Sequence, residues 1–349
     1  MQNGRYGEVQ AAIALVATVV GAGFASGREV LRFFSVFGHW AWVGCIVAAV
    51  TLAGLSAWTA LLSDRVAAYD LGTLCRRTLG DAGGFAAAWV NGALISVTAG
   101  AMLAAMGELA ALALPIRHAY AIGVMASLGL AARLAGRDIS VMAKVGGWLL
   151  PACLLLYMLL FIKREPQQAE FSMATGTWRA LPMAFSYASM NTALAGGILC
   201  ELGQGRGRSA VLRSSVMAGG LFLLLLLGAN AVLSQHVDAL ADAALPVVQL
   251  ARSYGAAGYW LCILTLSLAV ITTLIAVLRT LSRMLESALP SRLAKASLPL
   301  ALLLSLATGL TGFGTLVGNV YPLLGAASTL LFLAIMAKPL ANARITQRH

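Results

Sequence analysis

The sequence predicts an all-α polytopic membrane protein, because its composition is strongly apolar and long apolar segments recur throughout it. Of the 349 residues 60% are apolar and 11% are charged, and the mean hydropathy is +0.85. Apolar runs of roughly 18 residues or more, the length that crosses a bilayer, extend along the whole chain. About ten spans are expected: 8–37, 40–62, 84–113, 117–133, 141–162, 176–202, 210–234, 257–284, 297–312 and 316–338.

Composition also restricts the classes of function. The five cysteines have no metal-ligand or redox spacing, so we interpret them as small packing residues. The four histidines fall in loops or at chain ends, and no Asp-rich motif occurs. A membrane enzyme is therefore the least favoured class, and no organic cofactor is expected. Residues 1–349 are expected to form one transmembrane domain.

Lysine and arginine predict the orientation of the spans. With the N-terminus inside, 17 of the 24 Lys and Arg residues fall on the cytoplasmic side. The positive-inside rule then places both termini in the cytoplasm and the chain in the cytoplasmic (inner) membrane. This distribution accounts for the net charge of +11 without nucleic acid as a partner. Membrane lipid is the expected surrounding, and the oligomeric state stays open.

Three further segments have expected structures. The loop 63–83 is expected to hold a short surface helix, and 244–251, too short to span, an external helix lying over the bundle. Small residues recur at every fourth position of the third span, which allows close helix approach and predicts a central helix. These residues are Gly84, Ala88, Gly92, Ser96, Gly100 and Ala104.

The first span is interrupted by the segment Gly21-Ala-Gly-Phe-Ala-Ser-Gly27. Each glycine costs a helix roughly 1 kcal/mol relative to Ala, and an unwound segment persists in the bilayer only where protein or a water-filled cavity satisfies its backbone. A glycine-lined packing face is the alternative. Because Arg28 and Glu29 follow immediately, we favour a binding site at this break.

The sixth span is also expected to be interrupted, near Ser189. Five uncharged polar residues occur there within seven positions, which favours a site over simple hydrogen-bonding between helices: Ser186, Tyr187, Ser189, Asn191 and Thr192. Each break opens a set of five spans, so the segments 8–162 and 176–338 are expected to be inverted repeats. Matching broken helices in two such halves are typical of a transporter site at the midplane.

The motif Gly21-Ala-Gly-Phe-Ala-Ser-Gly27-Arg-Glu29, followed by Phe33-Phe34, resembles the start of the YkvI-type membrane proteins. These are amino-acid permeases of the amino acid–polyamine–organocation superfamily. Ser189-Met190-Asn191 resembles the break of that family, with Met where Tyr is usual, and Tyr321-Pro-Leu-Leu-Gly325 resembles its last-span motif. The resemblance extends over the whole chain and implies a leucine-transporter fold.

The resemblance also implies a sodium site. In sodium-coupled members of the superfamily the ion takes two carbonyls before the first break, and a carbonyl and two hydroxyls of the eighth span. The matching positions are Ala17, Val20, Ala269, Thr272 and Thr273. Oxygen ligands on one helix face suit a hard cation, and back-bonding of the threonines to the preceding turn is the alternative.

The expected substrate is a small amino acid or related zwitterion. Free amides at the start of a half-helix favour its carboxylate, and the expected donors are Ala22, Gly23 and Phe24. Its ammonium is expected at the carbonyls of Val19 and Phe185 or at the Ser189 hydroxyl, beside Asn191. Phe24 and Tyr187 are expected to close over its side chain, and a bundle that contains both breaks is expected to rock against the rest.

Three charged residues leave alternative roles open. Arg28 and Glu29 are expected to form an external gate, although Glu29 is alternatively a contact for a cationic substrate. A proton-coupled transporter of a solute other than an amino acid is an alternative. Proton coupling would use Lys144 of the fifth span, but its place near the cytoplasmic end favours snorkelling to the interface. The remaining alternatives are a channel or a sensor, which would lack saturable uptake.

Overall fold

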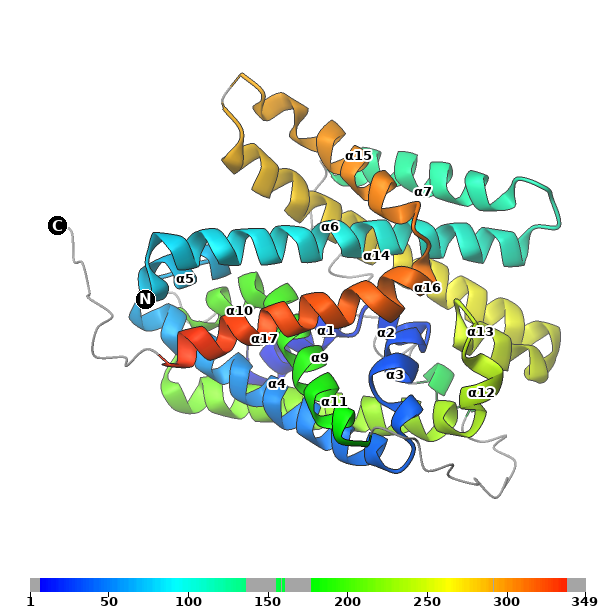
Figure 1. Ribbon diagram of the computed structural model, residues 1–349, viewed down its shortest axis with the longest axis horizontal. Helices are drawn as coiled ribbons and strands as arrows, with labels where there is room; N and C mark the ends of the chain where they lie inside the picture. The colour runs from blue at the N-terminus through cyan, green and yellow to red at the C-terminus, as the bar shows by residue number, and fades with distance from the viewer. Residues whose placement is uncertain (1–6, 136–154, 158, 161–176, 291, 338–349) are drawn as a thin grey trace.

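The computed structural model describes residues 7–135, 155–157, 159–160, 177–290 and 292–337, and within these ranges every regular element is helical (Figure 1). The described part holds five helical stretches long and apolar enough to cross a membrane: Trp40–Arg65, Asp81–Ala113, Arg208–Leu240, Pro246–Ala288 and Phe313–Ala337. The all-α polytopic fold class is confirmed. Most of the expected span 141–162, including Lys144, lies outside the described residues.

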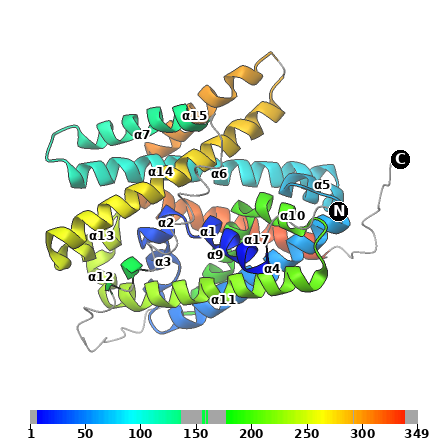
Figure 2. The same ribbon diagram turned by 180° about the vertical axis from the view of Figure 1, so that it is seen from behind.

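The helices form two groups that Figures 1 and 2 show on opposite sides of the molecule. One group comprises α6 (Asp81–Ala113), α7 (Ala119–Ala135), α14 (Gly255–Ala288) and α15 (Ser297–Gly309). The other comprises α1 (Glu8–Val19), α4 (Trp40–Arg65), α9 (Ala180–Leu194), α10 (Gly196–Gly203) and α11 (Arg208–Leu233). The last span, α16 (Phe313–Thr315), η6 (Leu316–Val320) and α17 (Tyr321–Ala337), packs on both α6 and α9.

The first span is broken twice. α1 ends at Val20, whose φ of −81° and ψ of 77° form a tight turn in which the Gly21 N–H donates to the Val19 carbonyl at 3.0 Å. The short α2 (Ala22–Ala25) follows. Gly27, with φ of +80°, then separates α2 from α3 (Arg28–Phe33), a conformation that glycine adopts without strain. The break expected at Gly21 is therefore present.

The sixth span is interrupted at Ala195, between α9 and α10, and not near Ser189 as expected. The interruption is mild, because the Ala195 N–H still donates to the Asn191 carbonyl at 3.0 Å. The polar side chains of α9 do not unwind it, because they donate to carbonyl groups while the helix stays intact. Thr192 donates to the Ala188 carbonyl at 2.8 Å, and Ser186 donates to the Pro322 carbonyl of α17 at 3.1 Å.

Most of the small-residue stripe of α6 faces neighbouring helices, whereas Ala88 is exposed. Gly92 lies near Met284 of α14. A Cβ added to Gly100 would lie 2.7 Å from the Gly309 nitrogen of α15, so a side chain there has no room. The Thr308 hydroxyl also donates to the Ser96 carbonyl at 3.1 Å. Backbone contact of this kind requires small residues, and α6 is a central helix.

Two short helices lie in the connecting segments that were expected to hold them. α5 (Leu71–Leu79) begins at Asp70, whose carboxylate accepts the Thr73 N–H at 2.8 Å. α13 (Pro246–Ala251), which follows the short α12 (Val237–Leu240), covers the first span, and the Val247 N–H donates to the Ser26 carbonyl at 3.0 Å. We call residues 237–251 the cover segment.

The described cysteines fit the packing interpretation. Cys45, Cys75 and Cys200 are buried free thiols, Cys262 is also buried, and Cys153 lies outside the described residues. Burial raises the pKa of the Cys75 thiol, in the connection between two spans, to about 12. Because the thiolate is the reactive form, this side chain is inert at neutral pH.

Candidate functional site

The first break leaves backbone groups unused on both of its sides. Because the Gly21 N–H turns to the Val19 carbonyl, the carbonyls of Ala17 and Val20 accept no backbone hydrogen bond from the described residues. Beyond the turn, three successive N–H groups donate to no described acceptor: Ala22, Gly23 and Phe24. Such groups are costly in a membrane unless they bind something. The break therefore offers oxygen acceptors on one side and N–H donors on the other.

Helix α14 brings Thr273 to the acceptor side of the break. A Cβ added to Gly21 would lie 3.9 Å from both the hydroxyl oxygen and the methyl group of Thr273. Thr272 satisfies its hydroxyl within α14, donating to the Leu268 carbonyl at 2.8 Å and to the Ala269 carbonyl at 3.0 Å. The Thr273 hydroxyl makes no such bond within the described residues. Of the expected cation ligands of α14, Thr273 thus lies beside the Gly21 turn, and its hydroxyl is the one not used within the helix.

Glu29 faces the interior of the protein on the donor side of the break. Its side chain is 6% exposed, and it is the one buried Asp, Glu, Lys or Arg among the described residues. The Tyr187 hydroxyl of α9 donates to its Oε2 at 2.9 Å. A Cβ added to Gly23 would lie 2.6 Å from its carboxyl carbon. Glu29 has no ion-pair partner within the described part of the chain.

The two arginines of α3 turn away from Glu29. Arg28 donates to the carbonyls of Ala241 and Ala243, at 2.6 and 3.0 Å, and so ties α3 to the cover segment. Arg32 donates to the Gly318 carbonyl of the π-helical turn η6 at 2.6 Å. The expected gate pair is therefore divided, with Arg28 on the cover segment and Glu29 in the core.

An aromatic cluster surrounds Tyr187. Its ring centroid lies 4.9 Å from that of Phe33, 5.2 Å from that of Phe34 and 6.1 Å from that of Phe222. Phe24 also contacts Phe222, at 6.3 Å, so Phe222 lies beside both residues expected to cover the substrate. Sequence reasoning missed Phe222, because it sits in the apolar run of α11 with no pattern to distinguish it.

The other expected substrate residues have different environments. The Phe185 carbonyl accepts the Thr329 hydroxyl of α17 at 3.5 Å, and its side chain is 44% exposed. The Val19 carbonyl already accepts the Gly21 N–H. Ser189 is buried in α9, and the Asn191 amide donates to the Tyr187 carbonyl at 2.9 Å. The residues brought together are Ala22, Gly23, Phe24, Tyr187 and Glu29.

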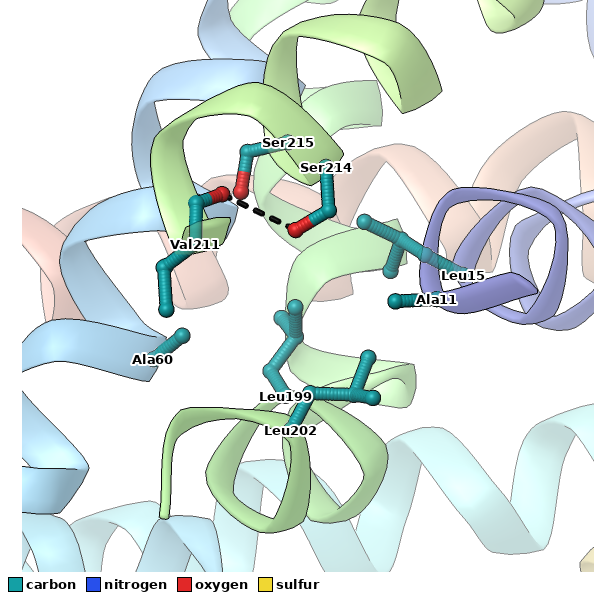
Figure 3. Close-up of a pocket in the computed structure, with 8 residues that line it drawn as sticks. All are labelled: Ala11, Leu15, Ala60, Leu199, Leu202, Val211, Ser214 and Ser215. Carbon is teal, nitrogen blue, oxygen red and sulfur yellow. Dashed lines mark hydrogen bonds between the residues drawn. The ribbon is translucent and has the colours of Figure 1, made fainter. Parts of the chain in front are cut away.

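A separate pocket opens between α1, α4, α10 and α11 (Figure 3). Small and apolar residues dominate its lining, and the Ser214 hydroxyl is satisfied by the Val211 carbonyl at 3.0 Å. Its lining residues are Ala11, Leu15, Ala60, Leu199, Leu202, Val211, Ser214 and Ser215. None of them is an expected site residue, so this pocket is distinct from the break.

Comparison with known proteins relates this arrangement to a fold. The chain is 26% identical over 343 residues to the uncharacterized membrane protein YkvI of Bacillus subtilis (strain 168), covering 97% of this chain and 98% of the relative. The structure is similar to the inward-facing conformation of Mhp1, with a TM-score of 0.67 and 13% identity over 96% of this chain and 77% of that chain. The chain has the leucine-transporter fold. No model of a known protein family matches it.

These similarities confirm the expected relative and the expected fold. The resemblance to YkvI holds along almost the whole chain, and the leucine-transporter fold confirms a multi-pass membrane protein. In this chain, the broken first span of the leucine-transporter fold is the segment from α1 to α3. The backbone groups at its first break and the side chains of Thr273 and Glu29 make up the candidate site.

Proposed function

We propose that this protein is a secondary active transporter of a small amino acid or a related zwitterion, coupled to sodium and working by alternating access. The observation that carries the proposal is the first break, which presents unused carbonyls and unused N–H groups within the membrane. A zwitterion and a cation together need both kinds of group.

The acceptor side of the break suits a sodium ion. The carbonyls of Ala17 and Val20 lie at the end of α1, and the Thr273 hydroxyl faces Gly21 from α14. Ala269 and Thr272 complete the proposed ligand set from the same helix. Oxygen donors of this kind are what a hard cation prefers, and these ligands come from both helix groups.

The donor side suits the carboxylate of the solute. The amides of Ala22, Gly23 and Phe24 are consecutive, and successive N–H groups of a turn favour an anion. Because α2 has only four residues and ends before Gly27, its dipole contributes little, and the individual N–H groups supply the attraction. Phe24 and Tyr187 supply apolar surface for the solute side chain.

Uptake into liposomes that contain the purified protein tests the proposal. We expect saturable uptake of one or more amino acids from a panel, driven by a sodium gradient. Replacing both Thr272 and Thr273 with Ala is expected to remove the sodium dependence, whereas Thr280→Ala, on the same helix, should retain it because its hydroxyl only back-bonds to Ala276. Ion conductance without saturable uptake would identify a channel, and uptake driven only by a proton gradient would overturn the sodium assignment.

A further inference from the structure

We propose that Glu29 binds a proton that crosses the membrane together with the solute, so that a proton is transported in addition to sodium. The inference rests on the proposed transport function, but the binding of the proton can be tested without it. The inference is based on the contacts that the Glu29 side chain makes with Gly23 and Tyr187.

The carboxyl group of Glu29 has a hydrogen-bond donor but, among the described residues, no positive partner. Tyr187 donates to Oε2, and the two neighbouring arginines donate to backbone carbonyls elsewhere. An ionised group buried in a membrane protein costs several kcal/mol unless it is paired. A proton bound to Oε1 removes that charge and leaves the hydrogen bond from Tyr187 in place.

Among the described residues, few titratable groups lie near Glu29. Tyr187 of α9 contacts it directly, Tyr321 is the first residue of α17, and Tyr157 donates to the Phe24 carbonyl at 2.8 Å. Three elements that pack on α3 contain no titratable residue, namely α2, η1 (Ser35–Phe37) and η6. The α11 surface near this site presents Phe222, and Arg28 is close to Asp242 of the cover segment. Glu29 is therefore the acidic group of this cluster.

The packing favours a proton over a larger ligand. The carboxyl carbon of Glu29 is so close to Gly23 that a single added methyl group would collide with it. Phe24 and Tyr187 are fully buried on the same side. No atom of a solute fits between Glu29 and Gly23 in this conformation, whereas a proton requires no cavity.

Gly23 explains why the proton and the solute would move together. The Gly23 N–H is a proposed donor to the solute carboxylate, and the other face of Gly23 is covered by the Glu29 carboxyl. Two carboxylates that share one small buried site cannot both be ionised. The solute therefore binds when Glu29 carries a proton, and Glu29 releases that proton after the solute has left.

Infrared difference spectroscopy on the purified protein in lipid, without solute, tests the proton site directly. Because burial favours the neutral form of a carboxyl group, we expect the band of a protonated carboxyl to change in the parent as the pH is changed between about 5 and 8. The change should be lost in Glu29→Gln, which keeps an oxygen for the Tyr187 hydroxyl. Glu108→Gln, which alters a half-buried carboxyl of α6, should retain it. A parent spectrum whose carboxyl bands are unaffected by Glu29→Gln would overturn the inference.

A transport measurement tests the coupling and separates its failure from that of the proposed function. With a pH-sensitive dye in the liposome lumen, uptake of a transported amino acid should acidify the lumen. Glu29→Gln should lower the number of protons moved per molecule of labelled solute transported at least tenfold. If the parent takes up amino acids without proton movement, the proposed proton coupling is wrong, whereas the proposed transport function is supported. If Glu29→Gln weakens binding of amino acids but not of their deaminated analogues, Glu29 holds the ammonium group and the inference is wrong.

No uptake of any amino acid would instead overturn the proposed function. The infrared experiment would still decide whether Glu29 binds a proton, because it needs no solute.

Discussion

The Tyr187 hydroxyl donates a 2.9 Å hydrogen bond to Oε2 of Glu29, across 158 positions of the sequence. The bond joins α3, beyond the first break, to α9, before the second interruption. Both side chains are buried, and Phe33 and Phe34 hold the Tyr187 ring in place. The two interrupted spans are thus coupled by one pair of side chains.

Removing this hydroxyl should destabilise the protein. Tyr187→Phe leaves the Glu29 carboxyl without its donor, which costs about 1–3 kcal/mol for a buried polar group. The loss is measured as a lower Tm of the purified protein in detergent. Tyr259→Phe is the matched control, because it removes a hydrogen bond of 2.7 Å to the Leu112 carbonyl at a half-buried site. A Tm loss no larger than that of the control would contradict the structural role of the Tyr187–Glu29 pair.

The two glycines of the break should differ in their tolerance of a methyl group. Gly23→Ala places Cβ within 2.6 Å of the Glu29 carboxyl carbon and must displace that side chain from Tyr187. Gly21→Ala meets nothing closer than 3.9 Å, and its backbone angles are extended. We expect Gly23→Ala to lower both Tm and amino-acid uptake, and Gly21→Ala to keep the parental Tm. Equal Tm values for the two variants would show that Glu29 does not pack against Gly23.

The two threonines of α14 should contribute unequally to sodium dependence. The Thr272 hydroxyl is already bonded within its helix, whereas the Thr273 hydroxyl faces the break. Thr273→Val, which conserves shape, is expected to raise the sodium concentration for half-maximal uptake at least tenfold, equivalent to about 1.4 kcal/mol. Thr272→Val should raise it less. An unchanged sodium requirement in Thr273→Val would exclude this hydroxyl as a ligand.

The two arginines of α3 should each stabilise a different segment. Arg28→Gln releases the cover segment from α3, and Arg32→Gln releases the π-helical turn η6. Hydrogen–deuterium exchange should accelerate over residues 237–251 in the first variant and over 313–320 in the second. Each variant is the control for the other. Faster exchange of both segments in both variants would indicate general loosening of the fold.

Much of the architecture could be predicted from the sequence because membrane spans, glycine breaks and small-residue stripes follow from local composition. The first break, the central helix α6 and the short helices α5 and α13 lie where their residues indicated. The position of the second interruption could not be predicted in this way. Whether Ser186 or Thr192 unwinds a helix depends on an acceptor being nearby, and one of these acceptors belongs to α17.

The candidate site was harder to predict because a helix that is apolar all round does not reveal which face is inward. Phe185 and Tyr187 were both expected at the site, yet residues two apart on an α-helix point in nearly opposite directions. The structure accordingly buries Tyr187 and exposes Phe185. The opposite directions of Phe185 and Tyr187 could have been predicted from their spacing in the sequence. The burial of Glu29 could not, because it depends on the orientation of α3 after Gly27.

The contact between Gly100 and Gly309 has a mechanical consequence. Because the two backbones leave no room for a side chain between them, we expect α6 and α15 to move together as one frame. The Tyr259 hydrogen bond fastens α14 to the same frame, and Thr273 therefore holds a fixed position on it. Ala17 and Val20 belong to the opposite group of helices. A cation bound between Thr273 and these carbonyls would hold the two helix groups together. Its release would allow the groups to move relative to each other.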